Sequence, residues 1–589
     1  MKRDAIFDQL ATAKRPLSFF NLQAQPKRQQ FLLDLHCEII VDLFAGGGGM
    51  SEGIELALNR HPDIALNHNE DALSLHAANH PQTEHLIADV REVCPYAATR
   101  GRKVGYLHLS PDCRDHSQAK GGQPRDRKIR ALSWVGIHWA GTVRPRVISL
   151  ENVVQLTRWS PMIAKRDPAT GRVVKLDLTV AAKGEYVPLH EQFLVPDPKR
   201  VGQTWRRFVA LLRGMGYTVE WQAGRACDQG VATLRERLMM IARCDGHPIV
   251  WPEATHSKSG GDGKLQYRPA AEIIDFSIPG RSIFGRKKSL AAATHRRIAA
   301  GIHRYVLTSA NPFIVPQTHQ GDLSATATGA SRGTNALGMP VLIQTGYGER
   351  AGQAPRALDI TKPLGTVVAG AAKHALATAY LAQMNGGFND VRGVPGRDLR
   401  TPMSSITNKG SQQQLITAHL AHLRGNCDAR DVTEPLHTIS AAGQHHALVE
   451  CTLSQENLEG ARRVAAFMRS YGFAPAANDD TVDDISPVMV EVDGVPYAIV
   501  DIHLRMLVPR ELFAAQGFPE SYIIDRGHDG REFTLTKQIH MCGNSVSPVW
   551  AAAYVRANLP DLILPPDHER GANRRAARHA PRSIERLAA

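Results

Sequence analysis

The stretch at residues 41–50, VDLFAGGGGM, decides how the rest of the chain is interpreted. An apolar run ends in Asp42, four glycines follow at 46–49, and residues 51–58 carry apolar side chains at helical spacing. This order predicts a strand, a tight turn and a helix. Glycines in such a turn leave room for a ligand against the backbone at the N-terminus of the helix.

Four more predicted strands follow, and polar or reactive residues stand at their ends. The strands span 64–66, 85–88, 104–109 and 146–150, and the residues at or just beyond their ends are Asn67, Asp89, Cys113 and Glu151. Strands that alternate with helices predict an α/β fold with a doubly wound, mostly parallel sheet. Ligands of such sheets bind beyond the carboxyl ends of the strands, so we expect these side chains around one site.

The bulk composition is that of a globular protein. The 589 residues suggest two to four domains, and the formal charge of +13 is compatible with a polyanionic partner. No apolar stretch reaches about 18 residues, so we expect no membrane partner. The N-terminus lacks the apolar core of a signal peptide, and we expect a cytoplasmic protein.

The cysteines and histidines predict neither a disulfide framework nor a metal site. The eight cysteines contain no C-x-x-C pair. The close histidine pairs, His419/His422 and His445/His446, have no evident further ligands. We therefore expect no metal, and we interpret most cysteines as small buried residues of a reducing compartment.

Cys113 and Glu151 nevertheless suggest chemistry, because both stand at strand ends. Arg235 and Arg237 alternate on an extended segment, so both can point the same way. A thiolate, a carboxyl group and guanidinium groups beside a cofactor pocket suit attack on an electron-poor ring.

Six motifs in order resemble those of the DNA (cytosine-5)-methyltransferases. They cover roughly 37–250 and 500–556, and chance agreement of all six is implausible even though each is weak alone. The motifs are DLFAGGGG at 42–49, SPDCRDHS at 110–117, ENV at 151–153, DQGVATLRER at 228–237, RELFAAQGFP at 510–519 and GNSVSP at 543–548.

The resemblance implies a fold, a reaction and a set of site residues. It implies a mixed sheet that binds S-adenosylmethionine, an inserted, mostly β target-recognition domain, and a flipped-out cytosine. Cys113 would add to ring carbon 6, Glu151 would contact ring nitrogen 3, and Arg235 would steady the base, with Arg237 beside it. The cofactor residues would be Phe44, Gly46, Gly47, Gly48, Gly49, Asn67, Asp89 and Asn544.

The chain departs from the family pattern at several of these positions. Asp112, not proline, precedes Cys113, and a carboxylate there should disfavour the thiolate, while Arg114 should offset it. Asn67 stands where an acid usually binds the cofactor ribose. Ala232 and Thr233 replace the usual Pro-Gln.

We expect five parts along the chain. They are a leader at 1–36, the catalytic and cofactor-binding domain at 37–250, a target-recognition region at 251–500, a C-terminal part at 501–560 that completes the catalytic domain, and a disordered basic tail at 561–589. The recognition region carries a weak repeat, with units that begin at Pro363, Pro402 and Pro435, and short β-units with basic loops are expected there.

Three functions remain open from the sequence. The favoured one is methylation of carbon 5 of cytosine in a specific double-stranded DNA sequence. The others are a catalytically weakened DNA-binding relative and an RNA (cytosine-5)-methyltransferase, although a long recognition region better suits the reading of duplex DNA. We expect a monomer, and a cognate restriction endonuclease is a candidate partner.

Overall fold

A computed structural model gives the arrangement of most of the chain. The predicted leader at 1–36 and the proline units that begin at Pro402 and Pro435 lie outside the residues that it describes. The described residues are 38–113, 115–116, 126–310, 312–317, 336–345, 352–369, 373–383, 385–386, 417–422, 429–431, 446–452, 455–473, 487–492, 495–564 and 585–586.

The N-terminal part folds around one mixed sheet, as the sequence predicts. Among the described residues its strand order is β23-β3-β2-β1-β4-β5-β9-β8. Strands β1 to β5 run parallel, whereas β9 runs antiparallel to both of its neighbours. The bounds are β1 Ile39–Leu43, β2 Ile64–Asn67, β3 Glu84–Ile87, β4 Val104–Leu109, β5 Val147–Asn152, β8 Thr218–Arg225, β9 Glu236–Arg243 and β23 Glu585–Arg586.

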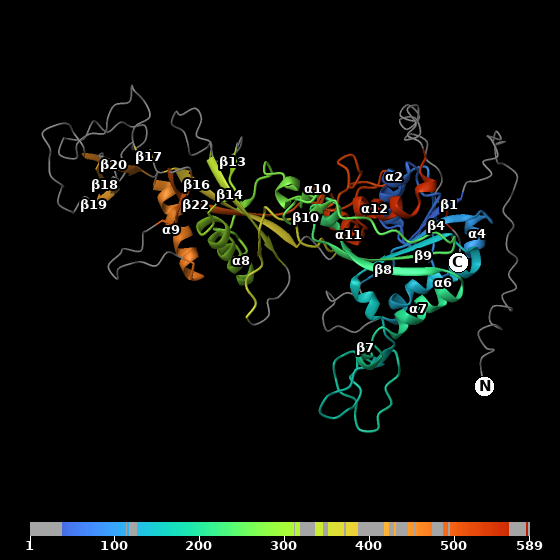
Figure 1. Ribbon diagram of the computed structural model, residues 1–589. Coiled ribbons are helices and arrows are strands. Elements are labelled where there is room, and N and C mark those ends of the chain that lie inside the picture. The colour runs from blue at the N-terminus through green and yellow to red at the C-terminus, as the bar shows by residue number, and fades with distance from the viewer. Residues whose placement is uncertain are drawn as a thin grey trace. The chain divides into compact units, whose positions relative to one another are not determined.

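Strand β1 is buried on both faces, which explains its nearly continuous apolar sequence. Ile39, Val41 and Leu43 pack with Trp139 of α6 (Val135–Val143) and Phe208 of α7 (Gln203–Gly214). The alternate residue Ile40 packs toward α2 (Gly49–Leu58) and α12 (Pro548–Asn558). Figure 1 accordingly shows α2 beside α12, and α6 beside α7.

The helices agree closely with the sequence pattern. Helix α7 buries Trp205, Phe208 and Leu212, whereas Leu211 is 39% exposed. The other helices of this part are α3 Glu70–Asn79, α4 Pro95–Thr99 and α5 Arg127–Arg130. The segment at 156–200 contains one short antiparallel pair of strands, β6 Met162–Ala164 and β7 Leu194–Pro196.

The recognition region is mostly β, as expected, and is built on a second sheet of order β12-β22-β16-β14-β13. Two helices pack on it, α8 (Ala292–Ile302) and α9 (Gln455–Ser470). The strands are β10 His256–Ser257, β11 Leu265–Gln266, β12 Arg281–Ser282, β13 Val315–Gln317, β14 Ala336–Gln344, β15 Ala357–Leu358, β16 His374–Gln383, β17 Asn385–Gly386, β18 Thr417–His422, β19 Ala429–Asp431, β20 His446–Thr452, β21 Met489–Val492 and β22 Val495–Met506.

The C-terminal segment returns to the first sheet. It contains α10 (Pro509–Ala515), α11 (Leu535–Asn544) and α12. Gly543 and Asn544 are the last two residues of α11. Gly53 of α2 allows α12 to pack closely, since a Cβ there would lie 2.7 Å from the Cβ of Ala551. No helix among the described residues is long and apolar enough to cross a membrane.

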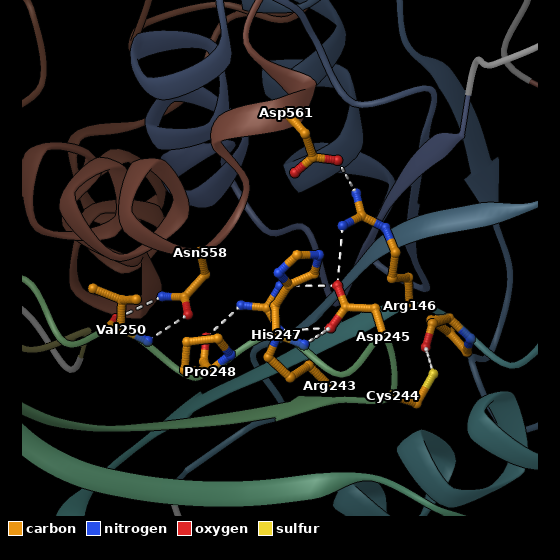
Figure 2. A network of polar contacts seen from close by, with 10 residues as sticks. Arg146, Arg243, Cys244, Asp245, His247, Pro248, Val250, Asn558 and Asp561 are labelled. Atoms are coloured by element: carbon orange, nitrogen blue, oxygen red, sulfur yellow. Dashed lines mark hydrogen bonds and ion pairs between the residues drawn. The ribbon is translucent and has the colours of Figure 1, made fainter.

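A polar network fixes this returning segment at the edge of the sheet where β5 begins (Figure 2). Arg146, just before β5, donates to Asp245 at 3.2 Å and to Asp561 at 2.6 Å. Asn558 of α12 exchanges two hydrogen bonds with the backbone of Val250. The network therefore lies at the amino ends of the parallel strands, and the carboxyl ends on the opposite side are available for the candidate site.

Candidate active site

The predicted site residues gather at the carboxyl edge of the parallel strands. The glycine turn follows β1, Asn67 ends β2, Asp89 follows β3, Cys113 follows β4, and Glu151 is the second-last residue of β5. Parallel strands in register bring these positions together, because the carboxyl ends lie along one edge.

The loop that carries Cys113 is fastened to the strands on either side of it. The Ser110 amide donates to Leu43 O at 3.4 Å, and Asn152 Nδ2 donates to Pro111 O at 2.9 Å. The His116 amide closes a turn onto Cys113 O at 3.0 Å. Arg114 lies outside the described residues. Asn152 of the ENV motif therefore positions the cysteine loop.

Glu151 and Arg237 form an ion pair beside this loop. Arg237 Nε lies 3.0 Å from Glu151 Oε1, and the two side chains are 13% and 9% exposed. Arg237 is at the start of β9, the strand that pairs with β5, so the antiparallel ladder brings the two residues together. The sequence resemblance gave Arg235 the leading role, but in the structure Arg237 is the arginine that pairs with Glu151.

Arg235 instead holds backbone segments together. It is buried and donates to Val367 O at 3.2 Å, Gly543 O at 3.0 Å and Ser545 O at 2.9 Å. Burial lowers the pKa of Arg235 to about 10, so it remains a cation at neutral pH. Arg235 therefore joins the catalytic part to the first proline unit and to the closing motif.

The first proline unit pairs with the segment just before Arg235. Thr233 and Leu364 form a parallel bridge, and Thr233 Oγ1 donates to Gly365 O at 3.3 Å. Residues 363–368 form no strand of their own, and their backbone docks on 232–235. The second half of this unit begins strand β16 at His374.

The charges around Cys113 oppose one another. Burial raises the pKa of the Cys113 thiol, Arg237 and Arg235 lower it, and Glu151 and Asp112 raise it. The net pKa lies above the ordinary value. Among the charged groups Arg237 has the largest effect on this pKa, and it favours the thiolate.

The glycine turn has the backbone that its sequence requires. Gly46 and Gly48 have φ of 54° and 93°, and Phe44 also has a positive φ, 62°. A bulky residue in this conformation is strained unless its surroundings hold it there. Ser110 Oγ donates to Phe44 O at 3.4 Å, so the cysteine loop helps to hold the turn.

Two of the glycines are needed for packing within the protein. A Cβ on Gly48 would overlap the hydroxyl of Tyr522, and one on Gly49 would overlap Ser545 Oγ and Val546 O. The interpretation that all four glycines make room for a ligand is therefore corrected for this pair. Gly46 does leave room for a ligand, since a Cβ there would meet only Phe44 O, at 3.7 Å.

The three polar cofactor candidates have local partners. Asn67 Oδ1 accepts from the Asn69 amide at 3.0 Å. Arg91 binds the Asp89 carboxylate, and its hydrogen bonds hold the pKa of Asp89 below its usual range. Asn544 lies at the exposed end of α11, 3.2 Å from His540 Nε2.

A buried chain of polar side chains, which no motif of the sequence indicates, runs beneath the turn. Asp42 accepts from Ser51 Oγ at 2.7 Å, and that hydroxyl lies 2.8 Å from His76 Nε2. His76 Nδ1 in turn lies 2.8 Å from His85 Nε2. Burial raises the pKa of Asp42 to about 7, while the bond from Ser51 acts in the opposite direction.

Comparison with known proteins agrees with this geometry. Residues 39–160, which contain the glycine turn, Cys113 and Glu151, match the family model described as C-5 cytosine-specific DNA methylase. The chain carries a C-5 cytosine-specific DNA methylase domain. The Type II methyltransferase M.AquIA of Picosynechococcus sp. is 22% identical to it over 227 residues, which cover 37% of this chain and 77% of that protein.

Two solved structures also resemble the chain that carries this methylase domain. The S. pombe Dnmt2 methyltransferase has a TM-score of 0.39 at 12% identity, and the Entamoeba histolytica methyltransferase EhMeth has a TM-score of 0.39 at 10% identity. Each comparison covers 90% of this chain and 99% of the other.

Proposed function

We propose that the protein is a DNA (cytosine-5)-methyltransferase that modifies cytosine within a specific duplex sequence, through a covalent adduct on a flipped-out base. The observation that carries the proposal is the grouping of Cys113, Glu151 and Arg237 at one sheet edge, next to a glycine turn in the methylase domain.

The turn and its neighbours fit S-adenosylmethionine. Gly46 leaves open backbone, and Asn67 and Asp89 place polar groups at the next two strand ends. A neutral Asn67 forms a weaker bond to a ribose than a carboxylate does, so we expect moderate affinity. When bound, the cofactor supplies an electrophilic methyl group.

The chain's own residues perform the remaining steps. The Cys113 thiolate forms a bond to ring carbon 6, and the displaced electron pair makes carbon 5 nucleophilic. Glu151, held by Arg237, keeps a proton at ring nitrogen 3 as this charge develops. After methylation, loss of the carbon 5 proton to a base allows the electron pair to expel the Cys113 thiolate.

Duplex DNA is the proposed substrate because a large, mostly β region is inserted between the motifs, and because the chain carries a net charge of +13. Lysine and arginine contacts to phosphates would make affinity fall steeply with salt. We further propose that the protein acts as a monomer in the cytoplasm. A cognate restriction endonuclease is a proposed partner.

Transfer of a labelled methyl group from S-adenosylmethionine to mixed-sequence duplex DNA tests the proposal. Cys113→Ala should abolish transfer, whereas Cys94→Ala, which changes an exposed cysteine elsewhere, should not. Duplex DNA that contains 5-fluorocytosine should trap a covalent complex, since fluorine blocks loss of the carbon 5 proton.

The outcomes separate the alternatives. DNA retardation without transfer would indicate the weakened relative, and preferential methylation of tRNA in a competition would indicate an RNA enzyme. Absence of any cofactor-dependent transfer, with no effect of Cys113→Ala, would overturn the proposal. Bisulfite sequencing of host DNA with and without the protein would then report the recognition sequence.

A further inference from the structure

Three potential metal ligands converge beside the glycine turn. Glu55 lies in the last turn of α2, His61 follows that helix, and His80 caps the end of α3. One ligand atom from each lies within 4.8 Å of the others. The Glu55 carboxylate oxygen is 2.9 Å from His61 Nδ1 and 3.4 Å from His80 Nδ1.

Both imidazoles of this cluster face the same carboxylate oxygen. His61 Nδ1 and His80 Nδ1 are buried, and the Glu55 carboxylate lies close to each of them. The His80 side chain is fully buried, so bulk water does not reach its ring. Two imidazole nitrogens and a carboxylate oxygen that converge in this way form a ligand set that suits one divalent cation.

We propose that Glu55, His61 and His80 bind one Zn²⁺ ion that serves a structural role. Zn²⁺ takes imidazole nitrogen and carboxylate oxygen at about 2.0–2.2 Å in a tetrahedral arrangement, which places neighbouring ligand atoms roughly 3.4 Å apart. The two Glu55–histidine separations, 2.9 Å and 3.4 Å, lie just below and at this value. Water completes the set, because Glu55 and His61 are 19% and 14% exposed and open the site to solvent.

The surroundings of His80 match those of a metal ligand. Metal-bound histidines use their second ring nitrogen for a bond that orients the ring. His80 Nε2 lies 3.4 Å from the Tyr522 hydroxyl, which donates to Gly47 O at 2.6 Å. The ion therefore joins α2 to α3 and supports the glycine turn, without contact with the methyl-transfer chemistry.

The sequence could not predict this site. The three ligands stand 6 and 19 residues apart, without the spacing of a known metal motif. Only the return of α3 beside α2 brings them together.

Zn²⁺ titration of the full-length, chelator-treated protein tests the proposal. Calorimetry should show one Zn²⁺ site, and Glu55→Gln and His61→Ala should each lower its affinity at least tenfold. Zn²⁺ should also raise the melting temperature of the wild type more than that of either variant. His190→Ala is the matched control, since His190 also lies beside a glutamate, 3.5 Å from Glu191, but is 80% exposed. Equal binding by all four proteins would overturn the proposal.

A measurement on the wild type covers the case in which the variants fail to fold. Diethylpyrocarbonate modifies histidines that are not bound to metal, and peptide mass spectrometry locates the product. Zn²⁺ should slow modification of His61 at least tenfold and leave His190 unchanged. Equal modification of His61 with and without Zn²⁺ would contradict the site, whatever the methyltransferase assay shows.

Discussion

Arg237 Nε lies 3.0 Å from Glu151 Oε1, in a site where both side chains are largely shielded from water. The pair links the end of β5 to the start of β9 and places a cation next to Cys113. A carboxylate, a guanidinium group and a thiol thus share one pocket, and each affects the charge of the others.

Arg237→Ala should reduce methyl transfer by roughly 100-fold, because removal of one preorganised charged group from an active site has effects of this size. Single-turnover transfer to duplex DNA measures it. Arg207→Ala, on the exposed face of α7, is the control and should change the chemical rate little. Equal rates for the wild type and Arg237→Ala would show that Arg237 has no part in the chemistry.

Arg235→Lys should instead lower stability. Arg235 donates three hydrogen bonds to backbone carbonyls, and a lysine cannot reproduce their planar geometry. Each charged hydrogen bond contributes about 1.5–3 kcal/mol, so we expect a loss of roughly 3 kcal/mol in the free energy of unfolding. Urea titration measures the loss. An unfolding midpoint equal to that of the wild type would show that these three hydrogen bonds do not stabilise the fold.

The first sheet was predictable because each strand is a short apolar run that ends in a turn. The same pattern placed Asn67, Asp89, Cys113 and Glu151 at one edge. Local sequence carries this information, since burial on both faces demands continuous apolar residues. The grouping of these residues followed from the rule that parallel strands end together.

Contacts between distant segments were not predictable. Arg235 meets Val367 across 132 residues, and no local pattern signals that contact. Helix α9 did carry a signal, because Ala461, Val464, Ala465 and Met468 form a buried stripe at helical spacing. Alanine is weakly apolar, so the stripe is faint in sequence. The tertiary fold reveals it.

Asp112→Asn should increase the reactivity of Cys113. The carboxylate of Asp112 raises the pKa of the thiol, whereas Arg237 lowers it. Loss of this carboxylate therefore lowers the pKa of the Cys113 thiol and raises its thiolate fraction at neutral pH. Iodoacetamide labelling, resolved by peptide mass spectrometry, should therefore be faster in Asp112→Asn and slower in Arg237→Ala. Labelling of exposed Cys94 is the internal reference. The same ratio of Cys113 to Cys94 labelling rates in the wild type and both variants would contradict this account.

Gly49→Ala should destabilise the fold, since its Cβ would overlap Ser545 Oγ and Val546 O. Overpacking of this kind costs about 1–3 kcal/mol. Gly214→Ala in α7 is the matched control, because no atom lies within 4 Å of its Cβ position. The Gly214→Ala substitution should stabilise the protein by up to about 1 kcal/mol. Thermal unfolding of both variants checks the prediction, and a melting temperature for Gly49→Ala at or above that of the wild type would refute it.

Asp42 should make stability depend on pH. Its pKa is about 7 in the folded protein and 3.8 ordinarily, so the unfolded chain releases the proton first. The contribution of Asp42 to stability is therefore complete below pH 3.8 and is lost as the pH rises to about 7. The difference between the two pKa values of Asp42 corresponds to roughly 4 kcal/mol in the free energy of unfolding.

Asp42→Asn removes this titration while keeping the shape of the side chain. Relative to the wild type, the variant should gain stability as the pH rises from 5 to 7, and the difference should level off above 7. Urea unfolding at each pH measures it, with Asp262→Asn at an exposed position as the control. A difference that is constant from pH 5 to 8 would mean that Asp42 is charged throughout, and that the bond from Ser51 outweighs its burial.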